Sequence, residues 1–263
     1  MDLSAINWLF SLSGLAVGCI VGLTGVGGGS LMTPLLIALF NVHPATAVGS
    51  DLLYAAGTKS VGTLVHGRSN SVNWTVVKRL ATGSVPATLL TFLLMIQTGM
   101  AATRSGVLVY ALGMVLLVTS ATMLFRNRIV TLLLQGMEGV SKRTISRLTI
   151  ATGAILGILV TLTSVGAGAI GVTALLVLYP RLPTVRIVGS DIAHAVPLTL
   201  IAGMGHWIFL NDVDWLMLVS LLIGSVPGIV VGALLAPRLP EGVLRILLAL
   251  VLVLVALKLF GLF

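Results

Sequence analysis

The sequence predicts an all-α polytopic membrane protein that consists of two inverted-topology repeats. Of its 263 residues, 57% are hydrophobic and only 8% are charged, whereas soluble proteins carry about 25% charged residues. Continuous apolar stretches, many of them roughly the 20 residues that cross a hydrocarbon core, separate the charges. The same short motifs also recur in the same order in both halves. Because the stretches are continuously apolar and do not alternate with period two, an outer-membrane barrel is excluded.

Apolar stretches divide evenly between the halves, and we expect eight to ten transmembrane or half-membrane helical segments, with glycine-broken helices in each half. The first two stretches of each half are short and joined through glycine, so each pair forms either two thin spans or one re-entrant hairpin. The stretches cover residues 6–24, 30–40, 45–66, 76–97 and 104–125, then 148–163, 169–180, 186–210, 215–236 and 241–262.

The longest polar stretch lies between the two halves. It predicts a first membrane repeat over residues 1–125, a cytoplasmic basic linker over residues 126–147, and a second, inverted repeat over residues 148–263. The linker contains the mixed segment TLLLQGMEGVSKR, which is a candidate for a short interfacial helix.

Motif spacing indicates an internal duplication. VGLTGVGGG at residues 21–29 corresponds to VTLTSVGAG at residues 160–168, and VGSD recurs at residues 48–51 and 188–191. His66 and His206 continue the series, as do the two GSVP motifs at residues 83–86 and 224–227. The offsets are 139, 140, 140 and 141 residues. Four matches in one order, at a nearly constant offset, are the signature of a repeat.

Basic residues predict how the halves are oriented. If the linker is cytoplasmic, 12 of the 15 Lys and Arg residues fall on the cytoplasmic side, and only Arg104 and Lys258 fall outside. Lys59 lies within a helix. This agrees with the positive-inside rule, and it requires each half to cross the membrane an odd number of times. One half is then upside down relative to the other, as in many secondary transporters, and both termini are predicted to be periplasmic.

A glycine-rich break precedes the short second stretch of each half, as TGVGGGS at residues 24–30 and TSVGAGA at residues 163–169. Unpaired backbone at membrane depth is tolerated where it lines a cavity. A helix that begins after such a break offers its N–H groups and positive dipole end to an anion. The alternative is that the glycines only allow close helix packing. Because the break recurs symmetrically, we favour a substrate site that includes Gly27, Gly28, Gly29, Ser30, Gly166 and Gly168.

Polar side chains inside the apolar stretches are further candidates, since a charge at the bilayer centre costs roughly 2.5 to 3.5 kcal/mol. Ser50, Lys59 and Ser190 are predicted to bind substrate. Asp51 and Asp191 have an alternative role, in which their carboxylates stabilise the N-termini of their own helices. The alternative for His66 and His206 is a position at the membrane interface. An imidazole titrates near neutral pH. The candidate proton-coupling residues are Asp51, Asp191, His66, His194 and His206.

Several function classes are disfavoured. The sequence has no Walker loop, no HExxH and no GxSxG in a strand-to-helix context, so we expect no enzyme and no cofactor. The single cysteine, Cys19, excludes an internal disulfide and a cysteine metal cluster, and we expect no metal site. The net charge of +8 fits loop charges that orient helices, so nucleic acid is not an expected partner. The N-terminal MDLSAINWLF lacks the positive segment of a cleavable signal.

GLTGVGGGSLMTPLL at residues 22–36, followed by HPATAVGSDL at residues 43–52, resembles the TauE/SafE family of sulfite exporters. The second-half segments SVGAGAIGVTALL and LPTVRIVGSD are similar to the repeat of that family. The most specific element is the GxGGGxLxxPxL pattern, present from Gly25 to Leu36. The second copy departs from it, because Thr173 stands opposite Pro34.

This resemblance implies a secondary transporter that exports a small sulfur-containing anion, sulfite or an organosulfonate such as sulfoacetate, across the bacterial inner membrane by alternating access. An anion channel and an uptake carrier for another small anion are the alternatives. The expected partners are the sulfur oxyanion, the lipid bilayer and a coupled proton, and a homodimer is compatible with the sequence.

Overall fold

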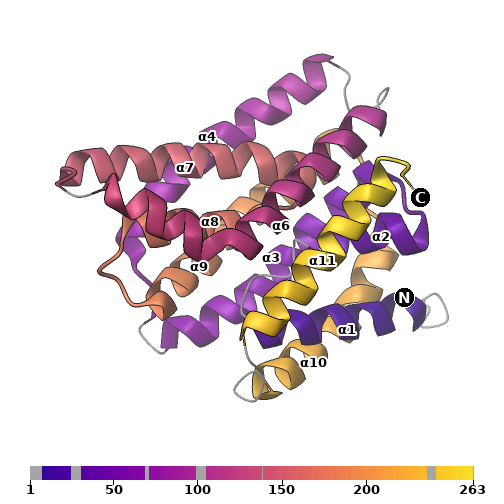
Figure 1. Cartoon of the computed structure of the whole chain (residues 1–263). Coiled ribbons are helices and arrows are strands. Elements are labelled where there is room, and N and C mark those ends of the chain that lie inside the picture. The colour runs from indigo at the N-terminus through magenta and orange to yellow at the C-terminus, as the bar shows by residue number, and fades with distance from the viewer. Residues whose placement is uncertain are drawn as a thin grey trace.

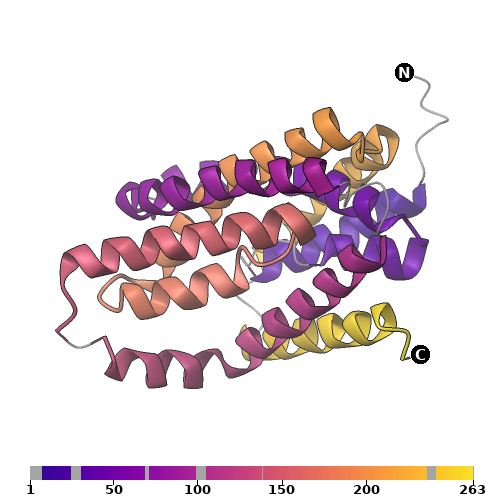
Figure 2. The same ribbon diagram turned by 90° about the horizontal axis from the view of Figure 1, so that it is seen from above.

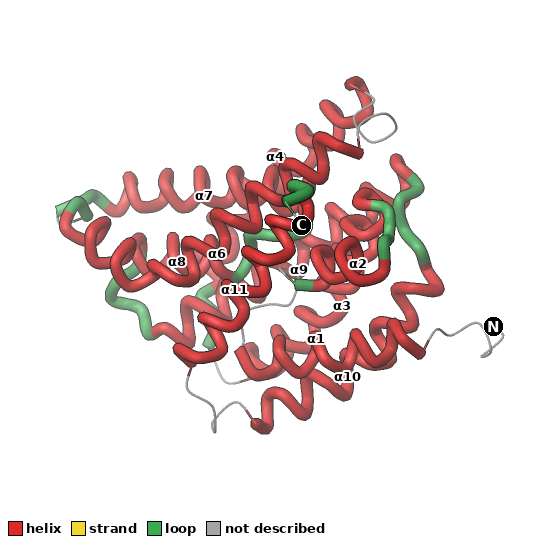
Figure 3. Tube along the Cα trace, turned by 45° about the vertical axis from the view of Figure 1, so that its right-hand side comes forward, coloured by secondary structure: helices red, strands yellow, loops and turns green. Residues whose placement is uncertain are grey.

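The computed structural model describes residues 8–24, 31–68, 71–98, 105–137, 139–235 and 241–262. All regular structure within these ranges is helical (Figure 1 and Figure 3), which confirms the predicted all-α class. The helices of the first half are α1 (Trp8–Thr24), α2 (Met32–Phe40), α3 (Pro44–Arg68), α4 (Trp74–Thr98) and α6 (Ser105–Gln135). Those of the second half are α7 (Lys142–Thr163), α8 (Ala169–Leu178), α9 (Thr184–Gly205) with the π turn η3 (His206–Leu210), α10 (Trp215–Leu235) and α11 (Glu241–Leu259).

Helix lengths separate membrane spans from half-helices. Within the described ranges, five helices are long and apolar enough to cross a membrane, over Trp74–Thr98, Val109–Gln135, Lys142–Thr163, Thr184–Leu210 and Trp215–Gly232. In contrast, α2 and α8 have 9 and 10 residues, so they extend about 14 to 15 Å at 1.5 Å per residue. That is half of the roughly 30 Å hydrocarbon core. Neither helix is therefore long enough to cross the membrane alone.

The segment predicted as a linker is more helical than its charges indicate. Helix α6 continues past Arg126 and Arg128 to Gln135, and α7 already begins at Lys142. Arg, Leu and Gln all favour a helix, so the helix continues until Gly136 and Gly139, the latter with a φ of 77°. The hydroxyl of Ser141 then caps α7 by accepting a hydrogen bond from the Thr144 backbone N at 3.2 Å.

Helices of one half pack mainly on helices of the other. Helix α1 packs on α10 and α4 packs on α7, while α3 pairs with α9 and α6 with α11. The duplication relates α1, α2, α3, α4 and α6 to α7, α8, α9, α10 and α11, in that order. This relation converts the α1–α10 pairing into the α7–α4 pairing, and it maps the α3–α9 and α6–α11 pairings onto themselves. Figure 1 shows α3 and α9 between the α1–α10 pair and the α4–α7 pair, and Figure 2 shows α4, α7 and α8 side by side. This pattern is compatible with an inverted repeat, and the opposite orientation of the halves in the membrane stays a prediction.

The close approach of these pairs depends on small residues at equivalent positions. A Cβ atom on Gly157 of α7 would lie 2.6 Å from the carbonyl oxygen of Ser84 in α4. A Cβ atom on Gly18 of α1 would lie 2.5 Å from the carbonyl oxygen of Ser225 in α10. Only glycine permits such backbone contact, as in other membrane helix pairs. The two GSVP motifs therefore belong to matching helix interfaces.

Candidate functional site

The second glycine break forms a buried, non-helical segment between α7 and α8. Ser164 ends α7 in the left-handed conformation with a φ of 59°, and Gly166 and Gly168 have φ values of 121° and 107°. Residues 164–168 are all buried, as unpaired backbone at membrane depth must be. In the first half, Gly27, Gly28, Gly29 and Ser30 lie outside the described residues.

The side chain of an aspartate lies at the start of each half-helix, and this aspartate belongs to the long helix that follows in the chain. Asp51 of α3 accepts two hydrogen bonds at Oδ2 from Thr33, the second residue of α2: from the backbone N at 3.1 Å and from Oγ1 at 2.6 Å. The carboxylate of Asp191 in α9 lies close to the backbone N–H of Gly168, at the start of α8. A methyl group on Gly171 would collide with Oδ1 of Asp191. A carboxylate suits these positions because the first N–H groups of a helix lack partners and carry partial positive charge.

The two aspartates do not lie at the N-termini of their own helices, which is the alternative role that the sequence allows. Helix α3 begins at Pro44 and α9 at Thr184, and neither has an acidic residue in its first turn. Asp51 and Asp191 instead lie two turns into these helices. Their carboxylates stabilise the N-termini of α2 and α8.

Lys59 is a buried cation that interacts electrostatically with both carboxylates. Its side chain is only 5% exposed, and both Asp191 and Asp51 lie within electrostatic range of its ammonium. Among the described residues no carboxylate lies within 4.0 Å of it, since the single ion pair found there joins His206 and Asp212. An offset of 140 residues places Thr199 opposite Lys59. The cation is therefore a point where the duplicated halves differ.

His194 and Tyr54 form a second asymmetric pair. The Nε2 atom of His194 lies 2.9 Å from Oγ of Ser84 in α4. The position equivalent to His194 is Tyr54, which is fully buried and lies next to Ser225 in α10. Sequence reasoning alone assigns Tyr54 no role, although the same 140-residue offset relates it to His194 and a 141-residue offset relates Ser84 to Ser225. Extending the repeat beyond identical letters would have found it.

These residues form what we call the central polar site: Asp51, Lys59, Ser164, Asp191 and His194. Ser164 adjoins the Asp51 carboxylate, and Gly168 adjoins that of Asp191, so the second break runs from one aspartate to the other. Within the described part of the chain no hydrogen-bond partner is found for several buried atoms of this region: Oδ1 of Asp51, Oδ1 of Asp191, Nδ1 of His194 and Oγ of Ser164. Buried polar atoms are nearly always satisfied in proteins. The site therefore has donors and acceptors ready for a small polar ligand or for water.

Ser50 and Ser190 have other partners. Oγ of Ser50 accepts a hydrogen bond from the Asp214 backbone N at 3.0 Å, and Oγ of Ser190 accepts one from the Asn73 backbone N at 2.8 Å. These equivalent bonds hold the loops that precede α10 and α4. The two serines thus have a structural role in this conformation.

His206 lies apart from the central polar site. His206 is buried at the C-terminal end of α9, where Nε2 lies 3.0 Å from the Thr161 carbonyl oxygen and Nδ1 lies 3.6 Å from Oδ2 of Asp212. Twelve residues separate it from His194, or roughly 18 Å along a helix. His66 belongs to α3, but its side chain lies outside what the structure describes. Among the described residues, no group of three or more His, Cys, Asp or Glu side chains is arranged to hold a metal ion.

Comparison with known proteins decides the family, because the model of the sulfite exporter TauE/SafE family matches residues 10–259. The chain belongs to this family. The probable membrane transporter protein YjnA of Bacillus subtilis is 38% identical over 253 residues, covering 94% of this chain and 97% of its own length. A probable membrane transporter protein of Xylella fastidiosa is 28% identical over 230 residues, with coverage of 86% and 83%. No solved structure matches the chain.

As a member of the TauE/SafE family, the chain is a multi-pass membrane transporter protein. The family match spans nearly the whole chain, so it includes both half-helices and both aspartates. The predicted family, the all-α fold and the membrane transport class are thereby confirmed.

Proposed function

We propose that this protein is a secondary transporter that exports a small sulfur-containing anion, sulfite or an organosulfonate, across the bacterial inner membrane by alternating access. The observation that carries the proposal is the buried Lys59, which lies within electrostatic range of Asp51 and Asp191, the two carboxylates at the starts of the half-helices. Sulfite and sulfonate oxygens accept hydrogen bonds from ammonium, hydroxyl and backbone N–H groups, and the central polar site offers these three kinds of donor through Lys59, Ser164 and Gly168.

The charges of the site favour proton coupling. Two ionised carboxylates and one ammonium leave a net charge of −1, and a further anion would raise the repulsion in a medium of low dielectric constant. Protonation of Asp51 or Asp191 removes this excess, so an anion binds best when one carboxylate is neutral. We propose these two residues as the proton carriers. His194 is a third candidate proton carrier. It is hydrogen-bonded to Ser84 and lies within electrostatic range of Lys59.

A carrier of this design has two accessible conformations. The aspartates hold α2 and α8 in place, and loss of one of their hydrogen bonds on protonation would free a half-helix N-terminus to bind the substrate. Inverted repeats can exchange conformations about such a central site. Orientation with the α6–α7 connection in the cytoplasm and both termini in the periplasm belongs to the same proposal.

Flux measurements in proteoliposomes test the proposal. The purified protein is reconstituted, and uptake of labelled sulfite, sulfoacetate, taurine, sulfate and acetate is compared with and without substrate on the opposite side. We expect saturable flux of a sulfite or sulfonate that is accelerated by substrate on the opposite side and responds to a pH gradient. Flux that rises linearly with concentration and shows no such acceleration would indicate a channel. Equal flux of acetate would contradict the sulfur-anion class.

A further inference from the structure

A cavity of about 800 Å³ lies away from the central polar site, where the end of α6, the start of α7 and the end of α8 meet. We call it the linker pocket. Its cationic side chains are Lys142 and Arg181, and Tyr179 is its other large polar residue. The apolar lining comes from Leu134, Met137, Val140, Ile145, Val177 and Leu178.

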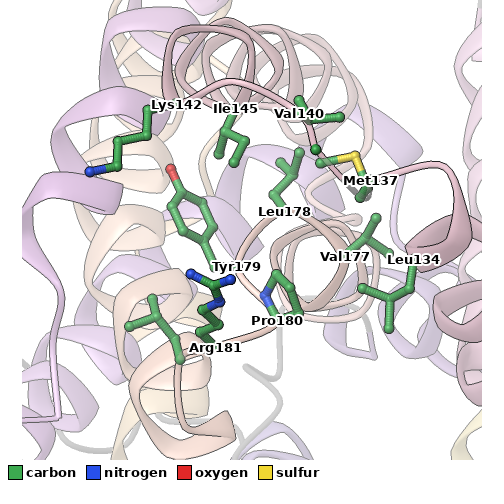
Figure 4. A pocket seen from close by; sticks show the side chains of 12 residues that line it. Leu134, Met137, Val140, Lys142, Ile145, Val177, Leu178, Tyr179, Pro180 and Arg181 are labelled. Atoms are coloured by element: carbon green, nitrogen blue, oxygen red, sulfur yellow. The ribbon is translucent and has the colours of Figure 1, made fainter.

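The lining is divided by chemistry. Figure 4 shows Lys142, Tyr179 and Arg181 together on one side, while Val140, Met137, Leu134 and Val177 occupy the other. Among the described residues neither Lys142 nor Arg181 has a carboxylate within 4.0 Å, since the ion pair found there joins His206 and Asp212. Within the described residues, the pocket thus has a cationic side with no acid at ion-pair distance, and an apolar side; Glu138, between the lining residues Met137 and Gly139, lies outside the described residues.

Hydrogen bonds hold the side chain of Tyr179 in place on the cationic side of the pocket. The Tyr179 hydroxyl lies 2.8 Å from Oγ1 of Thr149 and accepts a hydrogen bond from Nη1 of Arg79 at 3.0 Å. Oγ1 of Thr149 already donates to the Ile145 carbonyl oxygen at 2.7 Å, so the tyrosine proton points to Thr149. This network holds the ring between α4, α7 and α8.

The surroundings of the pocket are those of a lipid contact. Leu132 and Leu133 at the end of α6 are 69% and 53% exposed, and Leu148 of α7 is 41% exposed. In a transporter these large apolar side chains face acyl chains. The helix ends around the pocket carry the basic residues that the positive-inside rule assigns to the cytoplasmic interface, where anionic lipids give the membrane a negative surface.

We propose that the linker pocket binds an anionic phospholipid, with the phosphate at Lys142 and Arg181 and an acyl chain along the apolar side. A soluble anion would use only the cationic side and leave the apolar side exposed to water. A zwitterionic lipid carries a cationic group in its headgroup, and Lys142 and Arg181 would repel that group. Basic pockets between transmembrane helices at the cytoplasmic side commonly bind anionic headgroups.

Native mass spectrometry of the full chain in detergent tests this. Phosphatidylglycerol and phosphatidylcholine with identical acyl chains are titrated separately, and soluble glycerol phosphate is added as a competitor. We expect phosphatidylglycerol to bind at least tenfold more tightly than phosphatidylcholine. In the Lys142→Gln/Arg181→Gln variant its affinity should fall roughly 30-fold, at about 1 kcal/mol for each basic residue.

The matched control is the Arg143→Gln/Arg147→Gln variant, which removes two exposed charges of α7 that do not line the pocket. It should change the affinity less than threefold. Equal binding of both lipids, or equal losses in the two variants, would overturn the proposal. Full displacement of the lipid by glycerol phosphate would assign the pocket to a soluble anion and would overturn it as well. Because the readout is lipid binding, the result does not depend on the transported substrate.

Discussion

Thr33 donates two hydrogen bonds to the same oxygen of Asp51, from its backbone N at 3.1 Å and from Oγ1 at 2.6 Å. A carboxylate of α3 thus accepts the Thr33 backbone N–H at the start of half-helix α2, and the carboxylate of Asp191 lies at the start of α8. A half-helix N-terminus is often regarded as an open anion site. Here both termini already hold an anion of the protein, so substrate must either displace it or bind after it is protonated.

Asp51→Asn should uncouple transport from protons. The amide oxygen can still accept from Thr33, so the start of α2 is preserved while the titratable charge is lost. Substrate exchange should continue, but net flux should no longer respond to a pH gradient. Counterflow and gradient-driven flux in proteoliposomes measure the two separately. Asp214→Asn is the control, because an amide there can still accept from the Met217 backbone N. A pH response in Asp51→Asn as strong as in the unmodified protein would remove Asp51 from the proton pathway.

Gly171→Ala should disturb the start of α8. The new methyl group meets the carboxylate of Asp191, and such overpacking typically costs about 1–3 kcal/mol. We expect a lower thermal midpoint and a loss of flux larger than the loss of folded protein. Gly106→Ala is the matched control, since its Cβ atom would have no neighbour within 4 Å. Equal stability and flux in the two variants would show that Asp191 does not need its present position.

Tyr54→Phe tests whether the residue equivalent to His194 contributes to substrate binding. The ring keeps its packing in the core while the hydroxyl next to Ser225 is removed. We expect a several-fold higher KM with little change in thermal midpoint. Phenylalanine cannot form a hydrogen bond to the substrate at this position, and such a bond is worth about 0.5–1.5 kcal/mol. Concentration-dependent flux and thermal unfolding are the measurements. A lower midpoint with an unchanged KM would make Tyr54 a packing residue only.

Cysteine accessibility tests the proposed orientation. Cys19 is the single cysteine, so Cys19→Ser provides a background into which Ser141→Cys is introduced, between α6 and α7. A membrane-impermeant maleimide should label it in inside-out vesicles and leave it unlabelled in intact spheroplasts. Labelling in spheroplasts would place the α6–α7 connection in the periplasm and reverse the topology.

Sequence alone predicts the elements whose signal is local or repeated. Helix boundaries mostly agree to within two or three residues, because apolar stretches and glycines mark them, and the second break lies where the glycines of residues 166–168 predict it. Larger errors occur where helix propensity overrides charge, as in α6 beyond Arg126. The roles of Ser50 and Ser190 depend on contacts with loops 164 and 117 residues away, which no local pattern encodes. Lys59, in contrast, was identifiable as a lone cation inside an apolar stretch.

Anion binding by the Lys59→Met variant tests the central claim most directly. Purified protein and variant are titrated with sulfite, sulfoacetate and acetate, and thermal stabilisation is measured. Lys78→Met, which removes an exposed lysine of α4, is the control for charge. We predict selective stabilisation of the unmodified protein and of Lys78→Met by sulfite or sulfoacetate, and a loss of at least tenfold in affinity in Lys59→Met. Unchanged affinity in a folded Lys59→Met variant would contradict an anion site at the centre of the protein.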